Sequence, residues 1–182
     1  MSKTRRSRNV RGLVRTAVAT ALLLSSWAMS GPTAAGAAQA AAFAPGTYRI
    51  INVASHSSVR TYNAGAELFV SSTRENPGPF ELWQIDRRED GYTIQNVGIN
   101  MIRMLDSYAA VRQAVAGEPV VTNRDAGVWS IEPAGNGTFV IKVPGQDLLW
   151  NTEPPVVPRG DVRLRHANGS DTQRWSLVAA TG

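Results

Sequence analysis

The sequence contains no cysteine and only two histidines, His56 and His166. The absence of cysteine excludes disulfides, thiol chemistry and thiolate metal sites. Neither histidine has a suggestive neighbour, and the hydrolase motifs H-E-x-x-H and G-x-S-x-G do not occur. We therefore expect a protein that is not an enzyme and that carries no cofactor and no metal.

A long hydrophobic run is also missing. The mostly apolar stretch at residues 17–29 is shorter than the roughly 20 residues that a membrane-spanning helix needs. It follows a basic segment and precedes "AQA", which ends at Ala40 and resembles a cleavage site for signal peptidase. This order predicts a secretory signal peptide over residues 1–40, a secreted mature domain over residues 41–182, and no membrane partner.

The mature domain lacks an excess of positive charge. The chain has 19 Lys and Arg against 14 Asp and Glu, but residues 1–40 hold six of the bases and none of the acids. The mature domain therefore has 13 bases against 14 acids and a net charge near −1. This balance provides no net positive charge that would attract the phosphate groups of a nucleic acid. We therefore do not expect nucleic acid as a partner.

What the sequence does contain is an internal repeat. "WQI", "WSI" and "WSL" begin at Trp83, Trp129 and Trp175, which are separated by 46 residues in both intervals. A second pattern repeats beside the first, with "YRI" at Tyr48, "YTI" at Tyr92 and "FVI" at Phe139. Self-similarity at a fixed interval indicates a repeat architecture. Three pseudo-repeats of about 46 residues account for nearly all of the mature domain.

The periodicity within each unit is two, which is typical of β-strands. The repeated aromatic residues alternate with Ile or Leu, so each pair lies on one face of a strand. Shorter strand candidates lie between them: "SVRTY" (58–62), "ELFVSS" (67–72), "MIRML" (101–105), "EPVVT" (118–122), "DLLW" (147–150) and "DVRLR" (161–165). Turn residues separate these segments. The pattern predicts an all-β domain of twelve short strands, four in each unit.

Twelve strands in three units resemble a β-trefoil, in which a six-stranded barrel is closed at one end by three hairpins. Propellers have units of similar length but typically need four to eight blades. A single unit could not bury its own apolar face, but three related units can pack their apolar faces together into a shared core. The repeated aromatic residues are therefore expected in that core.

Two resemblances bear on function, and the first is to ricin-type lectins. "QRW" at Gln173 resembles the Q-x-W signature of that trefoil family, and Asp106 in "MLDS" resembles its sugar-binding aspartate. The signature is broken in the other two units, which have "ELW" at Glu81 and "GVW" at Gly127. A carbohydrate-binding module that uses Asp106 and Gln173 is the alternative function.

The second resemblance covers most of the mature chain. "GTYRIINVAS", "STRENPGPFELWQI", "YTIQNVG", "DLLWN" and "GSDTQRW" resemble the β-trefoil serine protease inhibitors best known from mushrooms. This resemblance implies a monomeric inhibitor that inserts a rigid loop into a trypsin-like protease. The loop of that family maps to "VRTYNAGA", which makes Arg60 the anchoring side chain, flanked by Thr61, Tyr62 and Asn63.

Two other arginines are candidate anchors on physical grounds. Arg74 lies in "STRENPGP", and Arg159 follows "PPVVP". Prolines restrict both loops, and a restricted loop loses less conformational entropy when it docks. Inhibition of a serine protease is the first functional prediction, and Arg60, Arg159 and Arg74 are its candidate anchors.

Overall fold

The computed structural model describes residues 43–71, 78–153 and 159–180. The predicted signal peptide and Arg74 lie outside these residues. The described part contains one α-helix, α1 (Val97–Arg103), and two 3₁₀ turns, η1 (Pro79–Glu81) and η2 (Asp171–Gln173). It also contains twelve strands: β1 (Gly46–Asn52), β2 (Val59–Arg60), β3 (Phe69–Ser71), β4 (Leu82–Arg88), β5 (Gly91–Asn96), β6 (Tyr108–Ala110), β7 (Val121–Asn123), β8 (Ser130–Gly135), β9 (Thr138–Lys142), β10 (Leu148–Thr152), β11 (Arg159–His166) and β12 (Trp175–Ala179).

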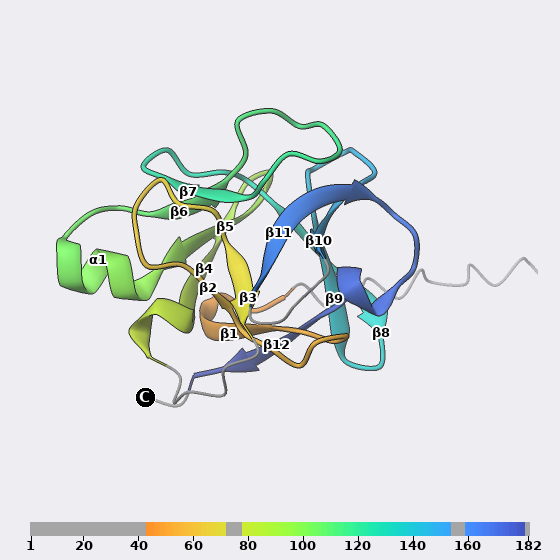
Figure 1. Ribbon diagram of the computed structural model, residues 1–182, viewed down its shortest axis with the longest axis horizontal. Helices are drawn as coiled ribbons and strands as arrows, with labels where there is room; N and C mark the ends of the chain where they lie inside the picture. Colours follow the sequence, from red (N-terminus) through yellow and green to blue (C-terminus); the bar gives the residue numbers. More distant parts are fainter. Residues whose placement is uncertain (1–42, 72–77, 154–158, 181–182) are drawn as a thin grey trace, which may run out of the picture. The chain divides into compact units, whose positions relative to one another are not determined.

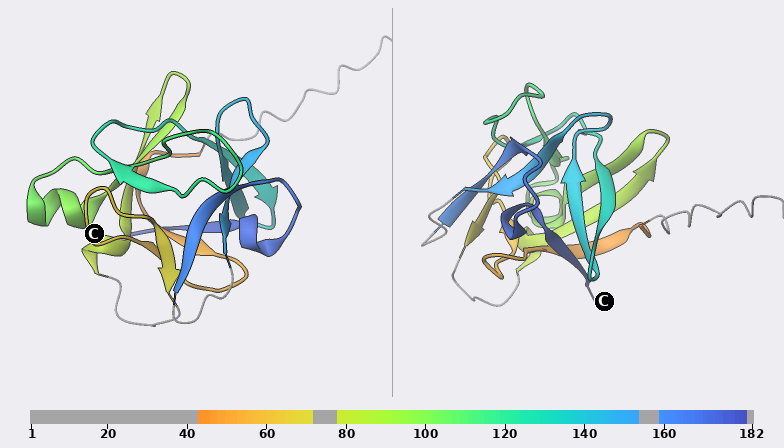
Figure 2. Two further views of the ribbon diagram at one scale, coloured as in Figure 1. Left: turned by 45° about the horizontal axis from the view of Figure 1, so that its top comes forward. Right: turned by 90° about the vertical axis from the view of Figure 1, so that its right-hand side faces the viewer.

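Six of the strands close into a barrel (Figure 1). β1 pairs with both β4 and β12, β4 pairs with β5, and β9 pairs with both β8 and β12. The ring is completed where Tyr92 and Trp129 exchange two backbone hydrogen bonds of 2.8 Å. The other six strands pair as β2–β3, β6–β7 and β10–β11. This is the β-trefoil that the sequence predicts, seen from two further directions in Figure 2.

The repeated aromatic residues lie opposite one another in the barrel. Tyr48 pairs with Trp83 and Tyr92 pairs with Trp129, while in the third unit Phe139 pairs with Trp175. The first and fourth strands of every unit therefore meet in the same register. This shared register explains why the chain repeats both aromatic positions at nearly constant spacing.

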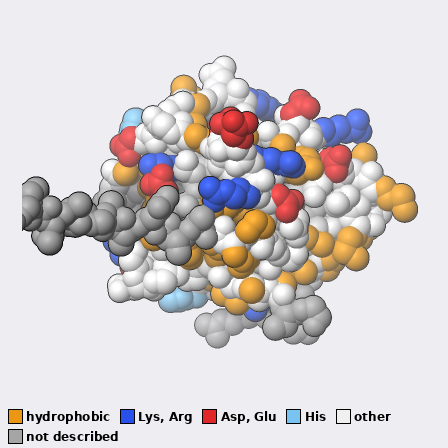
Figure 3. Space-filling view, turned by 180° about the vertical axis from the view of Figure 1, so that it is seen from behind, with side chains coloured by type: hydrophobic (Ala, Val, Ile, Leu, Met, Phe, Trp, Pro, Cys, Tyr) orange, Lys and Arg blue, Asp and Glu red, His pale blue; other side chains and the backbone are white. Residues whose placement is uncertain are grey.

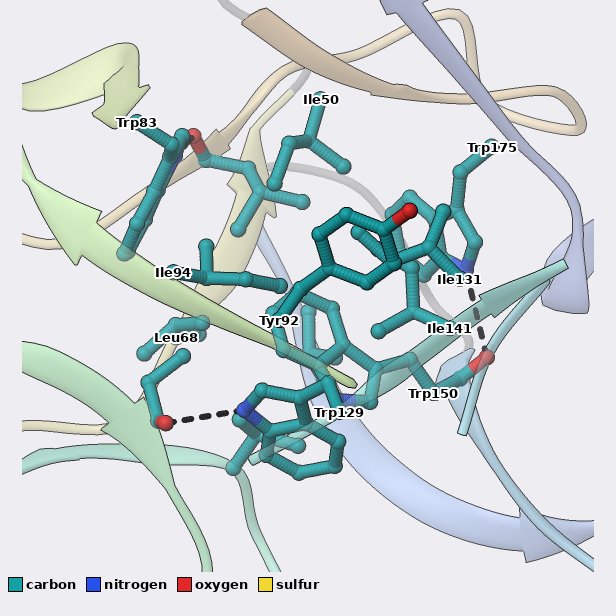
Figure 4. Packing of buried hydrophobic residues seen from close by; sticks show 14 of the residues in the cluster. Ile50, Leu68, Trp83, Tyr92, Ile94, Trp129, Ile131, Ile141, Trp150 and Trp175 are labelled. Carbon is teal, nitrogen blue, oxygen red and sulfur yellow. Dashed lines mark hydrogen bonds between the residues drawn. The ribbon is translucent and has the colours of Figure 1, made fainter. Parts of the chain in front are cut away.

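Each of the three tryptophans also reaches the hairpin of its own unit. The indole N–H of Trp83 donates to the Val59 carbonyl at 3.0 Å, and that of Trp129 donates to the Ala109 carbonyl at 2.9 Å. The Trp175 indole donates to the carbonyl of Trp150 at 3.4 Å. The bonds of Trp129 and Trp175 are dashed in Figure 4. Val59, Ala109 and Trp150 are thus equivalent positions of the three units.

The three hairpins meet in a closed ring of backbone hydrogen bonds. Leu68 donates to Val120 at 2.8 Å, Val120 donates to Val162 at 2.9 Å, and Val162 donates to Leu68 at 2.9 Å. All three residues are fully buried. The ring joins one residue of each unit around the pseudo-threefold axis, above the barrel core.

The second unit departs from the threefold pattern at α1. The connection between its first two strands has twelve residues, 96–107, between the paired residues Gln95 and Tyr108. The corresponding connections, 52–57 and 143–148, have six residues each. The strand predicted at "MIRML" is therefore wrong, because residues 101–103 belong to the helix and the second strand of the unit is β6.

Local contacts hold α1 firmly. Asn96 caps the helix by accepting the Ile99 N–H at 3.0 Å, and its amide donates to the Phe80 carbonyl at 2.9 Å. A Cβ at Gly98 would lie 2.6 Å from the Phe80 nitrogen, so only glycine permits this approach to η1.

In the described part of the chain, no helix is long and apolar enough to cross a membrane.

Replacement of each core tryptophan by phenylalanine tests the equivalence of the three units. Trp83→Phe and Trp129→Phe should each lower the free energy of unfolding by about 1–3 kcal/mol, because a buried carbonyl loses its donor and the core loses volume. Trp175→Phe should cost less hydrogen-bond energy, since its bond is the longest of the three. Urea denaturation of the mature domain measures the three losses. A negligible loss for Trp83→Phe would contradict the proposed role of these indoles.

Candidate functional site

The structure buries the arginine that was expected to anchor a protease. Arg60 is 4% exposed, and its guanidinium forms an ion pair with Glu81 of η1, which is 6% exposed. Its Nη1 also donates to the Tyr62 hydroxyl at 3.1 Å. The expectation that Arg60 projects from a surface loop is therefore wrong. The Arg60 side chain would have to break its ion pair with Glu81 before it could enter the specificity pocket of a protease.

The residues that flank Arg60 divide between the core and the surface. Thr61 is fully buried, whereas Tyr62 is 44% exposed and Asn63 is exposed. The Tyr62 ring packs against Phe69 and Phe80, with centroids 5.8 and 5.4 Å away. Only the turn from Tyr62 onward is therefore open to a partner.

Arg159, the second candidate anchor, lies along the surface at the start of β11. Its side chain is 48% exposed, and its Nε donates to Asp161 at 3.1 Å. The guanidinium also stacks over the Phe69 ring, 4.0 Å from the centroid. These two contacts fix the side chain against the domain, and a docking protease would have to break them. Arg74, the third candidate, lies outside the described residues.

The two residues expected to bind a sugar have different environments. Gln173 is 1% exposed and bridges two backbone groups, accepting the Asn168 N–H at 2.9 Å and donating to the His166 carbonyl at 2.8 Å. Its side chain thus fixes the loop before Trp175. Asp106 is exposed and accepts a hydrogen bond of 2.9 Å from Gln95. Of this pair, only Asp106 presents its side chain to a ligand.

Sequence reasoning missed a hollow beside the third unit. It encloses about 320 Å³ between β8, β9, β10 and the segment around η2. Its charged and polar rim includes Glu132, Lys142, Asp147 and Arg174, and Pro133, Val140 and Leu149 contribute apolar surface. The buried Gln173 also borders the hollow, so the one intact Q-x-W signature lies near a depression of the surface.

The charges around the hollow are paired but accessible. Lys142 contacts Glu132 at 2.9 Å, and Arg174 contacts Asp171 at 3.4 Å. The Asp147 carboxylate is 68% exposed and lies 4.0 Å from His166. A hydroxylated ligand could therefore find both acceptors and donors here without having to separate a buried ion pair. Asp147 is the most open acceptor of the set.

A second polar cluster lies on the other side of η2. The Asn151 amide donates to Glu153 at 3.2 Å, and the Thr172 hydroxyl donates to Asn151 at 2.8 Å. Arg165 donates to Glu153 at 2.7 Å, and this hydrogen bond is the main reason that the pKa of Glu153 lies below its ordinary value. The network ties β10, β11 and η2 together. Among the described residues, no group of three His, Asp or Glu is arranged to hold a metal ion.

The face seen from behind in Figure 3 carries acidic and basic side chains side by side, without a broad field of one sign. Exposed apolar side chains gather at the edge of this view where α1 lies. The exposed apolar side chains of α1 and the residue after it are Met101, Ile102 and Met104, which are 68%, 60% and 89% exposed.

Comparison with solved structures shows what this fold is similar to. A ricin B-like lectin from Macrolepiota procera, solved in complex with lactose, matches with a TM-score of 0.64 and 18% identity, over 74% of this chain and 95% of the lectin. The Rhizoctonia solani agglutinin matches with a TM-score of 0.65 and 19% identity, over 76% and 98% of the two chains. ThreeFoil, a designed threefold symmetric protein, matches with a TM-score of 0.62 and 17% identity, over 74% of this chain and 99% of ThreeFoil.

No protein-family model and no curated protein matches the chain. At these identities the structural matches establish the β-trefoil fold alone.

Glu81→Gln tests the buried ion pair. Removing the carboxylate charge leaves the Arg60 guanidinium without its counter-charge in the interior, which should cost about 3–5 kcal/mol of stability. Glu132→Gln is the matched control, because its partner Lys142 is partly exposed, and it should cost less than about 1 kcal/mol. Chemical denaturation of both variants gives the comparison. Equal losses would show that the Arg60 pair is no more important than a surface pair.

Glu153→Gln should have a pH-dependent effect. Because the folded-state pKa of Glu153 is lowered, its ionised form stabilises the fold at neutral pH, and this contribution is lost as pH falls through the lowered pKa. The variant should be less stable than wild type at pH 7, by less than about 1 kcal/mol because the pair is partly exposed. Thermal unfolding should show this difference shrinking below about pH 4. A difference that persists at pH 2 would contradict the assignment to ionised Glu153.

Proposed function

We propose that this β-trefoil domain binds saccharides and that the hollow beside the third unit is a binding site. The observation that carries the proposal is the combination of open hydrogen-bonding groups and apolar surface in one depression. A sugar presents hydroxyl groups around its ring and apolar C–H faces above and below it. Asp147 and Glu132 would accept from hydroxyl groups, and Lys142 and Arg174 would donate to ring and hydroxyl oxygens.

The size of the hollow restricts the ligand. At about 320 Å³ it lies at the lower end of the range of roughly 300–1,000 Å³ that small-molecule sites occupy. Such a volume suits one or two sugar rings, with the remainder of a longer glycan in solvent. The aliphatic side chains of Pro133, Val140 and Leu149 provide a surface for a C–H face.

The fold comparison gives independent support for this class of ligand. The Macrolepiota procera lectin was solved with lactose. A lectin from Polyporus squamosus was solved with a sialylated trisaccharide and matches with a TM-score of 0.58 and 20% identity, over 74% of this chain and 49% of the lectin. Inhibition of a serine protease stays a prediction from the sequence resemblance. It draws less support from the geometry, because Arg60 is buried and Arg159 is fixed against Phe69.

The proposal is tested with purified residues 41–182 and a panel of neutral mono- and disaccharides that includes lactose. Titration should show saturable binding, and Asp147→Asn should weaken binding in the hollow about tenfold or more, since a hydrogen bond to a charged acceptor contributes about 1.5–3 kcal/mol. Asp90→Asn, at the exposed turn between β4 and β5, is the matched control and should bind like wild type.

Two results would overturn this proposal. One is the absence of binding to every sugar of the panel at millimolar concentration. The other is stoichiometric inhibition of trypsin by a domain that binds no sugar, which would instead support the protease-inhibitor prediction.

A further inference from the structure

We propose that Asn168 is a site of spontaneous deamidation and that the fold protects Asn136 from the same reaction. The sequence contains two Asn-Gly pairs, Asn136–Gly137 and Asn168–Gly169, and both asparagines are exposed. Glycine favours the reaction at the preceding asparagine, because no side chain hinders the glycine nitrogen. Since both pairs have this advantage, the difference between them comes from the backbone in which each is held.

Deamidation is an attack by the backbone nitrogen of the following residue on the side-chain amide carbon, Cγ. A bond forms between that nitrogen and Cγ, the Cγ–Nδ2 bond breaks, and the backbone proton leaves with the amide group as ammonia. Water then opens the five-membered succinimide at either carbonyl, which gives aspartate or isoaspartate. Water is the only co-reactant. The attacking nitrogen must first turn to the same side of the Cα–C bond as Cβ.

The conformation of Asn136 keeps the Gly137 nitrogen away from Cγ. Asn136 has a φ of 52°, in the left-handed region, where ψ is about +47°. This ψ places the next nitrogen almost opposite Cβ, so the peptide would have to rotate by about half a turn. On either side of the two-residue turn, Gly135 pairs with Thr138, whose hydroxyl also donates to the Gly135 carbonyl at 2.7 Å. Attack at Asn136 therefore requires the end of the β8–β9 hairpin to open.

Asn168 lies in a loop between β11 and η2, where the backbone is less restricted. Its φ is negative, and in both of the main regions with negative φ the next nitrogen is only about a quarter turn from the position of attack. Within the described residues, the Gly169 N–H donates no hydrogen bond. The peptide between Asn168 and Gly169 can therefore turn without the opening of a strand pair.

The loop also places a donor on the oxygen that the attack makes negative. The Ser170 N–H donates to the Asn168 side-chain oxygen at 2.9 Å. Negative charge develops on this oxygen when Cγ is attacked, and a backbone donor that is already in place stabilises such a charge. On the other side of the residue, the Asn168 N–H is held by the buried Gln173 at 2.9 Å. The reacting side chain is thus fixed at one end, while the attacking nitrogen stays free.

Deamidation would change the wall of the hollow. Ala167, Gly169 and Ser170 line the hollow on either side of Asn168. Either product adds a carboxylate between these residues, and isoaspartate also adds a methylene to the main chain. The reaction needs no ligand, but its effect on binding rests on the proposed function.

The test is incubation of the purified mature domain in neutral buffer made with heavy-oxygen water, followed by digestion and mass spectrometry of both Asn-Gly peptides. Asn168 should be converted at least about fivefold faster than Asn136, because opening the hairpin end breaks at least one hydrogen bond. In concentrated urea the two rates should agree within about twofold, because the unfolded chain no longer holds the two turns differently.

Asn168→Ser is the control for the assignment, because serine has no amide group and keeps a side-chain oxygen for the Ser170 N–H. It should abolish conversion in its own peptide and leave the rate at Asn136 unchanged. Equal rates at the two asparagines of the folded domain, or faster conversion of Asn136, would overturn the proposal. An Asn168 that reacts in urea but not in the folded domain would overturn it as well.

The effect on the hollow has a separate measurement. The deamidated form, isolated by ion exchange, should bind a sugar of the panel at least about threefold more weakly than the unmodified domain, a loss comparable to one hydrogen bond. Equal affinities would overturn the effect on the hollow and leave the modification in place. Absence of binding by the unmodified domain would instead count against the proposed function, and the mass spectra would still decide whether Asn168 is modified.

Discussion

The closed ring of hydrogen bonds among Leu68, Val120 and Val162 is the constraint on which this architecture depends. Each of these backbone groups is buried, and a buried N–H without an acceptor would cost as much as a lost hydrogen bond. Because each unit supplies one donor and one acceptor, all three hairpins must be present and in the same register for the ring to close. The ring therefore makes the three units interdependent, in addition to the barrel pairing beneath it.

This shared register fixes the inward positions and leaves the outward ones free to differ. Inside the barrel, the aromatic–tryptophan pairs repeat in all three units. One step beyond the carbonyl that accepts each indole, the three units hold Arg60, Ala110 and Asn151. Arg60 is in a buried ion pair, Ala110 is a small buried residue outside the central hydrophobic cluster, and Asn151 joins the polar network with Thr172. Equivalent backbone positions thus carry unrelated chemistry, and function has to be sought unit by unit.

The repeat spacing was sufficient to predict the trefoil, because tryptophans 46 residues apart can share a register only if the units are structurally alike. The α1 helix was not predicted, since "MIRML" has the hydrophobicity of a strand and the six additional residues become apparent only once the neighbouring strands are paired.

The candidate sites depended still more on contacts between distant residues. The prediction that Arg60 is exposed was wrong because its partner Glu81 is 21 residues away. No residue near Arg60 in the sequence indicates this ion pair. The hollow could not be inferred because Glu132, Asp147 and Arg174 come together only through the pairing of β8, β9 and β10. Asp106 was predicted from its motif, yet its hydrogen bond with Gln95 was not, since that contact depends on how β5 and the chain before β6 are paired.

The buried ion pair that argues against Arg60 as an anchor links the first unit to the start of the second. It connects β2 to η1, and η1 in turn receives Gly98 and the Asn96 amide at the start of α1. Since α1 ends at Arg103, only three residues before Asp106, its anchored N-terminus limits how far the chain leading to that carboxylate can move. Preorganisation of this kind reduces the entropy lost when a ligand binds. The Arg60–Glu81 ion pair and the contacts of η1 with Asn96 and Gly98 thus form one continuous series that links the hairpin of the first unit to the start of α1.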